Sequence, residues 1–222
     1  MNIFPLDKYS HIFPDPRYAC DEGILAYGGD LNPNRIITAY RNGIFPWYNE
    51  NDPILWWSPN PRLVLDFDDF KLSRSLKKVI DKNIFEIKFD ENFTQVMIEC
   101  QKVNRKNQNK TWINDDIIKA YTKIHEMGFA HSFESYYNGE LVGGGYGLSI
   151  GDIFCGESMF SKKDDASKVA LYYLVERLKN KGFNLIDCQI PTPHLISLGA
   201  KSISRNNFLT LLNKALENPL DF

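Results

Sequence analysis

The chain has 222 residues, of which 43% are hydrophobic, 24% charged and 14% aromatic, with a formal net charge of −2. This composition excludes a disordered chain, and the charge excludes a global basic field for nucleic acid, so nucleic-acid contact would need a local patch. The four cysteines form no CxxC pair, which argues against a zinc site and a disulfide scaffold. No signal-peptide pattern and no bilayer-length apolar run are present, so we expect a cytoplasmic protein without membrane contact.

The first part of the chain differs in composition from the rest. Residues 1–62 hold eight of the 11 prolines and three of the four tryptophans. One helix is predicted there, with Asn32 as its N-cap and Gly43 as its end. Loops surround this helix, so we predict a small loop-rich domain over 1–62 and a larger domain over 63–222. The aromatic cluster around Trp47 fits the core of a small domain as well as it fits a ring-binding surface.

Regular elements follow from residue 63. The pattern predicts a strand at 63–65, helices at 71–80 and 93–103, a strand at 84–89, an exposed basic loop at 104–110 and a helix at 114–128. The first of these helices has a basic face formed by Arg74, Lys77 and Lys78, with Lys82 just beyond it. Like charges at this spacing cost helix stability, which favours contact with a polyanion, although a solvated basic face is the common alternative.

Three strands joined by tight turns come next. A hairpin of 130–137 and 140–150 turns over Asn138-Gly139, and a third strand follows at 152–157. Four glycines, at positions 143, 144, 145 and 147, lie in the second strand. Glycine in a strand marks a bulge or a close approach of a ligand. We therefore interpret the run as the floor of a binding cleft with Glu157 at its edge, and a bent hairpin is the alternative.

The remaining elements complete a mixed α+β fold. They are a helix at 164–181, a strand at 184–190 and an amphipathic helix that begins after Ser204. Helices thus alternate with hairpin-linked strands, so the larger domain is predicted to be a mixed sheet flanked by helices.

The candidate chemistry lies on the last two predicted strands. Asp187 and Gln189 are two residues apart, so their side chains share a face. With Glu157 they would bring two carboxylates and an amide to one site, which suits deprotonating and orienting an amine nucleophile. Two carboxylates could bind a divalent metal, but no histidine or further acid completes a set of ligands. A purely structural role for these strand-end residues is a further alternative. A nucleophilic Cys155 with a histidine base is the rival chemistry, although free cysteines are more often inert.

Several longer segments carry a family resemblance. They are Leu25-Ala-Tyr-Gly-Gly-Asp-Leu31, Gly43-Ile-Phe-Pro-Trp47, Pro53-Ile-Leu-Trp-Trp-Ser-Pro59, Thr111-Trp-Ile113, Phe154-Cys-Gly-Glu-Ser-Met-Phe-Ser161, Leu185-Ile-Asp-Cys-Gln189 and Ser197-Leu-Gly-Ala200. With them the chain resembles the bacterial leucyl/phenylalanyl-tRNA–protein transferases over nearly its whole length. A weaker likeness, of residues 140–145 to the acetyl-CoA cradle of N-acetyltransferases, starts with Glu instead of Gln or Arg and leads into more strand.

The resemblance implies a small N-terminal domain and a C-terminal domain of N-acetyltransferase-like fold. It implies transfer of Leu or Phe, with Met as a third candidate, from aminoacyl-tRNA to the α-amino group of proteins that begin with Lys or Arg, which marks them for degradation. The implied partners are the 3′ end and acceptor stem of charged tRNA and the acceptor protein, and we expect a monomer. The aminoacyl ester is already activated, so no cofactor or metal is expected.

The resemblance also assigns residues. It implies catalytic Glu157, Asp187 and Gln189, pocket tryptophans Trp47 and Trp112, an apolar pocket at Phe154 and Gly156, and a tRNA-acceptor surface at Arg74, Lys77, Lys78 and Lys82. Gly145 stands where relatives can have a larger apolar residue, which implies a wider pocket. We hypothesise that Asp187 draws the amine proton off through Gln189 while Glu157 orients the attacking group, and the final proton acceptor stays open. The alternatives are an acetyl-CoA-dependent N-acyltransferase and an inactive tRNA- or peptide-binding module.

Overall fold

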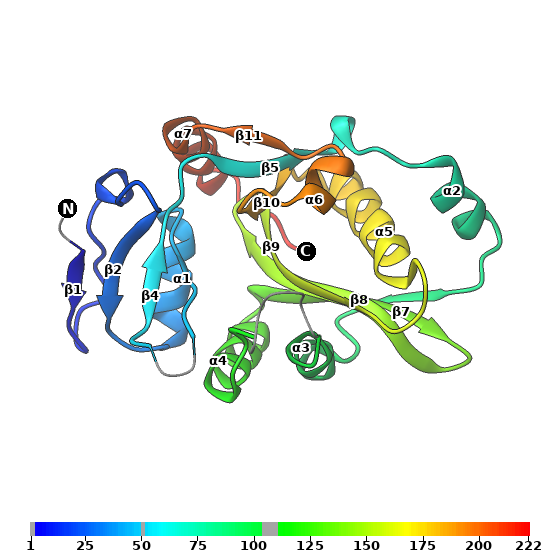
Figure 1. Ribbon diagram of the computed structural model, residues 1–222, viewed down its shortest axis with the longest axis horizontal. Coiled ribbons are helices and arrows are strands. Elements are labelled where there is room, and N and C mark those ends of the chain that lie inside the picture. The colour runs from blue at the N-terminus through cyan, green and yellow to red at the C-terminus, as the bar shows by residue number, and fades with distance from the viewer. Residues whose placement is uncertain (1–2, 50–51, 104–110) are drawn as a thin grey trace.

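Two sheets organise the chain (Figure 1). The computed structural model describes residues 3–49, 52–103 and 111–222. The smaller sheet has the strand order β1-β2-β4-β3, and the larger has the order β11-β5-β10-β9-β8-β7-β6. Every strand of the smaller sheet precedes every strand of the larger one in the sequence, which confirms the prediction of an α+β chain with a small N-terminal unit.

The small sheet consists of very short strands packed beside one helix. Its strands are β1 (Phe4–Leu6), β2 (Ile24–Gly28), β3 (Phe45–Pro46) and β4 (Leu55–Trp57). The predicted helix is confirmed as α1 (Pro33–Arg41), because the side chain of Asn32 accepts a hydrogen bond from the backbone N–H of Asn34 at 2.9 Å. The strands were not predicted, since runs of two to five residues give too short a pattern for periodicity.

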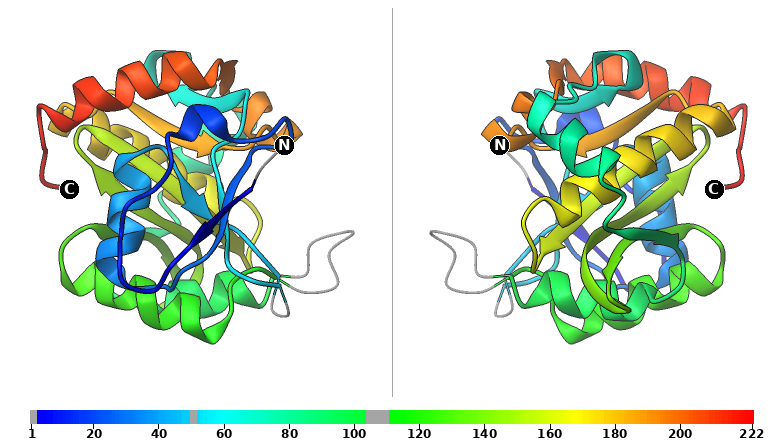
Figure 2. Two further views of the ribbon diagram at one scale, coloured as in Figure 1. Left: turned by 90° about the vertical axis from the view of Figure 1, so that its left-hand side faces the viewer. Right: turned by 90° about the vertical axis from the view of Figure 1, so that its right-hand side faces the viewer.

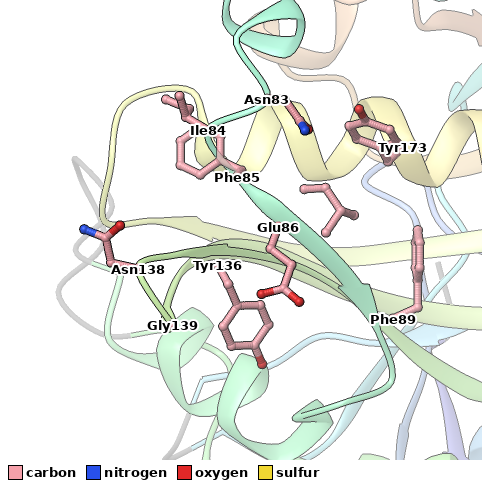
Figure 3. Close-up of a pocket in the computed structure, with 10 residues that line it drawn as sticks. Asn83, Ile84, Phe85, Glu86, Phe89, Tyr136, Asn138, Gly139 and Tyr173 are labelled. Atoms are coloured by element: carbon pink, nitrogen blue, oxygen red, sulfur yellow. The ribbon is translucent and has the colours of Figure 1, made fainter.

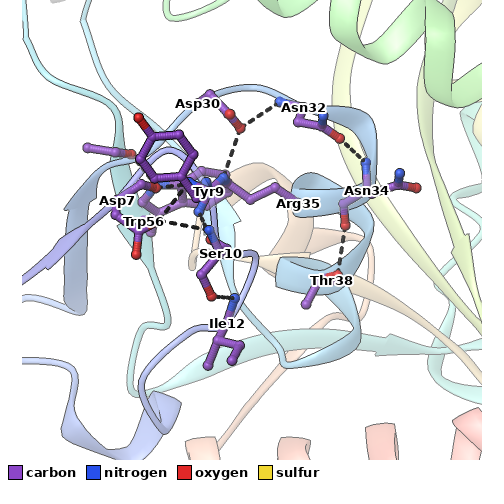
Figure 4. Close-up of polar contacts among 11 residues, drawn as sticks. Asp7, Tyr9, Ser10, Ile12, Asp30, Asn32, Asn34, Arg35, Thr38 and Trp56 are labelled. Atoms are coloured by element: carbon purple, nitrogen blue, oxygen red, sulfur yellow. Dashed lines mark hydrogen bonds and ion pairs between the residues drawn. The ribbon is translucent and has the colours of Figure 1, made fainter.

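A buried arginine fixes the N-terminal segment against α1 (Figure 4). The Arg35 side chain is fully buried, and its guanidinium donates to the carbonyl oxygens of Asp7 (2.8 Å) and Ser10 (2.7 Å). It also donates to the carboxylate of Asp30 at 2.8 Å. These charge-assisted hydrogen bonds replace the water that the guanidinium loses on burial. They fix the position of α1. The last turn of this helix contains Tyr40, whose side chain reaches into the large domain.

The large sheet is mixed. Its strands are β5 (Arg62–Asp66), β6 (Glu86–Phe89), β7 (Ala130–Tyr137), β8 (Glu140–Ile150), β9 (Ile153–Ser161), β10 (Leu185–Gln189) and β11 (Lys201–Ile203). Neighbouring strands are antiparallel except for β9 and β10, which run parallel. The β7–β8 hairpin turns over Asn138 and Gly139 as predicted, and both residues have positive φ.

Helices cover both faces of this sheet (Figures 1 and 2). The helices of the large domain are α2 (Arg74–Asp81), α3 (Phe93–Gln101), α4 (Asp115–Glu126), α5 (Ala166–Lys181), α6 (Pro193–Ser197) and α7 (Arg205–Leu216). One face of the sheet is covered by α3 and α4 and the other by α5 (Figure 1). The core under α3 and α4 is continuous with the N-terminal unit, since Trp56 and Tyr40 belong to the same buried cluster as Tyr121 and Phe208. The N-terminal unit therefore packs on the large domain through a shared core.

The glycine run in β8 serves packing within the protein. A Cβ atom at Gly143 would lie 2.6 Å from the Cβ of Ala166, so this glycine lets the start of α5 approach the sheet. A Cβ at Gly147 would lie 2.3 Å from the carbonyl oxygen of Cys155 and 2.5 Å from the ring of Phe154. The interpretation of the run as a cleft floor is therefore corrected: these glycines admit neighbouring side chains and backbone.

A few boundaries differ from the predictions. The second helix begins at Arg74 instead of residue 71, because the Ser73 hydroxyl accepts from the N–H of Leu76 (3.1 Å) and caps it. Strand β9 runs on to Ser161, and the short α6 and β11 were not predicted. The predicted loop at 104–110 lies outside the described residues, and the division between residues 62 and 63 stays a prediction. None of the described helices has the length and apolar character needed to span a bilayer.

Candidate active site

Two β-bulges bring Glu157 and Gln189 together. Along β9, Gly156 and Ser158 have partners on β8 and Glu157 between them has none, while along β10 the pairing with β5 skips Cys188. A bulge leaves one residue unpaired and redirects the neighbouring side chains. Gln189 accordingly has a φ of +59°, and its side-chain Nε2 donates to Glu157 Oε1 at 2.6 Å. The two predicted residues thus meet through irregular backbone.

Two uncharged donors contact the Glu157 carboxyl. Its Oε1 also accepts from the hydroxyl of Tyr40 at 2.6 Å, and the hydroxyls of Tyr40 and Tyr121 are 2.8 Å apart. Burial raises the pKa of Glu157 to about 7, although the hydrogen bonds from Tyr40 and Gln189 favour the charged form. A carboxyl with a pKa near neutral can take up and release a proton under physiological conditions.

Asp187 is in a different environment. It is fully buried and forms a bidentate ion pair with Arg62, with distances of 2.8 Å from Nε to Oδ1 and 2.6 Å from Nη2 to Oδ2. Its Oδ1 also accepts the backbone N–H of Gln189 at 3.0 Å. The Arg62 guanidinium lies over the rings of Phe45 (5.0 Å) and Phe208 (4.4 Å). Asp187 therefore contacts the backbone of Gln189, whereas the amide group of Gln189 points to Glu157.

A cavity of about 600 Å³ opens beside Glu157. Its wall is mainly aromatic and aliphatic, and four of the predicted pocket residues line it: Trp47, Trp112, Phe154 and Gly156. Side chains of α5 and of the sheet close its apolar part, namely Leu171, Leu174, Phe133, Met159, Ile186 and Leu65. Glu157, Gln189, Ser158, Thr192 and His194 supply a few polar groups on a mainly apolar wall, as is usual for a small-molecule site.

Two predicted site residues lie behind the wall of this cavity. Asp187 and Gly145 are not among the residues that line it. A Cβ atom at Gly145 would lie 2.6 Å from Met159 Cγ and 2.6 Å from Phe133 Cζ. The side chains of Met159 and Phe133 already fill the space that a larger residue at 145 would take. The wider pocket implied for Gly145 is therefore not formed.

The rival cysteine chemistry has no support in this geometry. The Cys155 side chain is 1% exposed, and burial together with the charge of Asp187 raises the pKa of its thiol well above the usual value. A thiol in this state is protonated and does not act as a nucleophile. Cys155 therefore belongs to the core under Glu157.

The predicted tRNA surface lies on an exposed helix. Arg74, Lys77 and Lys78 on α2, and Lys82 at its end, are all exposed. Lys77 forms an ion pair with Asp81 at 3.0 Å, which offsets part of the positive charge. Helix α2 packs on α5 through Leu76. The basic face of α2 and the cavity therefore lie on opposite sides of α5.

One cluster of the described residues has metal-ligand chemistry. Candidate donor atoms of Asp90, His125 and His131 lie within 4.8 Å of one another. Their atoms are already engaged, because His131 Nδ1 is 2.9 Å from Asp90 Oδ2 and His125 Nδ1 is 2.7 Å from the carbonyl oxygen of Ala130. Hydrogen bonds within the protein thus account for the cluster.

Comparison with known proteins decides the family. Residues 64–213 match the family model described as leucyl/phenylalanyl-tRNA protein transferase, and residues 29–60 match the model of its N-terminal domain. The curated leucyl/phenylalanyl-tRNA–protein transferase of Sulfurimonas denitrificans is 57% identical over 211 residues, covering 95% of this chain and 92% of the relative. The chain belongs to this transferase family. The Syntrophobacter fumaroxidans relative of the same description is 54% identical, covering 96% of this chain and 90% of its own length.

One solved structure illustrates a distant likeness in fold. The structure described as L-PGS from Bacillus licheniformis has a TM-score of 0.39 and 13% identity, and the match covers 78% of this chain and 57% of that one. A likeness at this level adds nothing to the family assignment.

A second hollow, of about 670 Å³, lies at the edge of the large sheet around β6 (Figure 3). Tyr136 and Phe89 line it from the sheet, and Tyr173 reaches it from α5. The Tyr136 hydroxyl donates to the buried Glu134 at 2.8 Å. Glu86 is the carboxylate among the residues that line this hollow, and it pairs with Lys88 at 3.5 Å. The hollow has no counterpart of the Glu157 arrangement.

Sequence reasoning missed the residues that hold the catalytic candidates in place. Tyr40 and Tyr121 stand at helical spacing with the apolar residues of two predicted helices, where a tyrosine gives no sign that its hydroxyl forms a polar contact. Arg62 gave a usable signal, because it is a charged residue at the start of a strand whose next three residues are apolar. A charge that enters a core strand needs a buried partner.

Proposed function

We propose that this family member transfers Leu or Phe, with Met as a third candidate, from aminoacyl-tRNA to the α-amino group of proteins that begin with Lys or Arg. The observation that carries the proposal is the Glu157 carboxyl, with a pKa near 7, on the wall of an apolar cavity that can take one amino-acid side chain. The family assignment supports an aminoacyl-tRNA donor and a protein acceptor. Marking of the product for degradation, a cytoplasmic location and a monomeric state stay predictions.

The chemistry needs little beyond positioning and one base. The acceptor amine attacks the carbonyl carbon of the aminoacyl ester, a C–N bond forms, and the C–O bond to the terminal ribose breaks. An ammonium group gives up two protons on the way to an amide. One of them reaches the departing ribose oxygen, and in this proposal the other passes to Glu157 and then to solvent. The donors Tyr40 and Gln189 hold the Glu157 carboxylate in one orientation for this step.

The contacts support a positioning role for Asp187. The Asp187 carboxylate is neutralised by Arg62 and does not line the cavity, so a bound amine has no direct path to it. Its bond to the N–H of Gln189 stabilises the bulge that aims the Gln189 side chain at Glu157. We therefore assign proton acceptance to Glu157, in place of the sequence-based hypothesis of a relay from Gln189 to Asp187.

The parts of the aminoacyl-tRNA have separate candidate surfaces. The apolar part of the cavity, which includes Phe154 and Gly156, suits a Leu or Phe side chain by its lining. Trp47 and Trp112 offer flat aromatic surfaces to the ester-bearing end of the tRNA. Arg74 and Lys78 on α2 offer cations to the phosphates of the acceptor stem, and such contacts weaken as salt rises.

Transfer of radiolabelled Leu, Phe and Met from charged tRNA to two peptides tests the proposal. One peptide begins with Arg and the other with Asp, and neither ATP nor CoA is added. We expect label on the Arg peptide alone, and we expect Glu157→Gln to abolish it. The matched control is Glu176→Gln, because Glu176 is an exposed carboxylate on α5 and should be dispensable.

The outcomes separate the candidate functions. Label on neither peptide, with tRNA binding intact, would replace the proposal with an inactive binding module. Transfer from labelled acetyl-CoA in a separate reaction, with no transfer from charged tRNA, would favour the N-acyltransferase alternative. Full activity of Glu157→Gln would leave the transferase function standing and remove Glu157 as the base.

A further inference from the structure

The last residue described, Phe222, lies behind the apolar cavity. Figure 1 shows the segment after α7 returning to the side of β9. The Phe222 ring stacks on the ring of Phe154, with 5.5 Å between centroids and an interplanar angle of 30°. Phe154 is fully buried and lines the cavity, and it meets Phe133, a second lining residue, edge to face at 6.5 Å. Phe222 is therefore in contact with the cavity wall without lining the cavity.

The backbone of Phe222 is held by cations of α5. Arg177 donates from Nη2 to the Phe222 oxygen at 3.2 Å, and its guanidinium lies over the Phe222 ring at 4.9 Å. Lys181 donates to the same oxygen at 2.9 Å. A charged hydrogen bond and a cation over the ring at one residue fix both its main chain and its side chain.

A histidine ring also packs against Phe222. The His131 ring stacks on it at 4.2 Å with an interplanar angle of 19°. Both nitrogens of His131 face oxygens, with Nδ1 at 2.9 Å from Asp90 Oδ2 and Nε2 at 3.2 Å from the carbonyl oxygen of Gly128. His131 is thus held at two points. Phe222 therefore stacks both on the anchored His131 ring and on Phe154 of the cavity wall.

We propose that Phe222 is a specificity-determining residue, which sets the depth of the cavity by supporting Phe154 from behind. The inference rests on the proposed function, since it assumes that the cavity takes the transferred side chain. Protein interiors are close-packed, so Phe154 cannot move away from a bound side chain while Phe222 and His131 stand behind it. Removing the Phe222 ring leaves a space into which Phe154 can retreat, and a larger residue pushes Phe154 forward.

Two substitutions of opposite size test the proposal. Wild-type protein, Phe222→Ala and Phe222→Trp are each given an equal mixture of Leu-charged and Phe-charged tRNA with the Arg peptide, and the ratio of kcat/KM values is measured. We expect Phe222→Ala to raise the Phe-to-Leu ratio by about tenfold, since one methylene in an apolar pocket is worth roughly that much. We expect Phe222→Trp to lower the ratio.

The control separates selectivity from stability. Phe4→Ala truncates a partly buried phenylalanine of β1, which packs on Tyr18 and lies at the opposite edge of the small sheet from the cavity-lining strand β3. We expect Phe4→Ala to leave the Phe-to-Leu ratio of kcat/KM values unchanged, even if it destabilises the protein. An unchanged ratio in both Phe222 variants, with both charged tRNAs still used, overturns the proposal and leaves the function intact. Shifts in the same direction in both variants also overturn it, because a smaller and a larger residue at 222 must displace Phe154 in opposite directions. Failure of wild-type protein to use either charged tRNA is a failure of the proposed function instead.

Discussion

The raised pKa of Glu157 makes a prediction about stability that is independent of any substrate. In the unfolded chain this carboxyl has its ordinary pKa of 4.5, and in the folded protein burial raises the pKa to about 7. The folded state therefore binds the proton more tightly, so Glu157 contributes stability below pH 4.5 and this contribution is lost as the pH rises through 7. Glu157→Gln removes the titrating group and keeps an oxygen that can accept from Tyr40 and Gln189.

The size of the effect follows from the two pKa values. Each pKa unit corresponds to about 1.4 kcal/mol, so the whole shift from 4.5 to about 7 is worth about 3 kcal/mol, of which about 2.5 kcal/mol falls between pH 5 and pH 8. We expect the free energy of unfolding of Glu157→Gln, relative to wild type, to rise by about that amount over this range. At pH 8 the variant should be the more stable protein.

Urea unfolding followed by tryptophan fluorescence at pH 5, 6, 7 and 8 gives the required free energies. Titration of other groups cancels in the difference between variant and wild type. The exposed Glu176→Gln serves as control and should show a difference that does not change with pH. A pH-independent difference for Glu157→Gln would refute both the raised pKa and the enclosure of this carboxyl. A second consequence of the raised pKa is that the wild-type transfer rate should increase as the pH rises through 7.

Three further substitutions test other parts of the structure. Asp187→Asn leaves the buried Arg62 without its counter-charge, so urea unfolding should show a loss of about 3–5 kcal/mol, and the double variant with Arg62→Met should lose less than the sum of the single changes. Arg35→Met removes three charge-assisted hydrogen bonds; we expect a loss of at least about 2 kcal/mol in the same assay and faster amide hydrogen exchange in residues 4–10. Gly143→Ala brings its Cβ to 2.6 Å from that of Ala166, and thermal unfolding should report a loss of about 1–3 kcal/mol that Ala166→Gly partly restores. The contacts described would be contradicted by additive losses in the Asp187 and Arg62 variants or by unchanged hydrogen exchange in Arg35→Met. They would also be contradicted if Ala166→Gly restored none of the stability lost in Gly143→Ala.

Local sequence patterns sufficed for most helices and for the central hairpin. Asn32, Ser204 and Asn114 cap their helices through side-chain hydrogen bonds, as their positions in the sequence predicted. Asn138-Gly139 formed the expected turn because both positions require positive φ. The small sheet escaped prediction because its strands are held by pairing across distant segments, such as β1 with β2, instead of by a local pattern.

The glycines show why a correct composition signal led to a wrong interpretation. Their number in β8 did mark a place of close approach. Sequence alone could not say whether a ligand or the protein itself would fill the space. The neighbours turned out to be Ala166 of α5 and the ring of Phe154, which come from other elements.

By itself the sequence determined the candidate site residues, the family and the order of the elements, since these depend on residue types and local spacing. Only the tertiary structure decided which of these groups meet and what each one contacts. Strand alternation predicts that the side chains of Asp187 and Gln189 share one face. In the structure a bulge directs the Gln189 side chain to Glu157, while Asp187 forms an ion pair with Arg62. Arg62 stands 125 residues before Asp187, and Tyr40 stands 117 residues before Glu157. Burial by such distant partners sets the pKa of Glu157, and burial is a property of the folded chain.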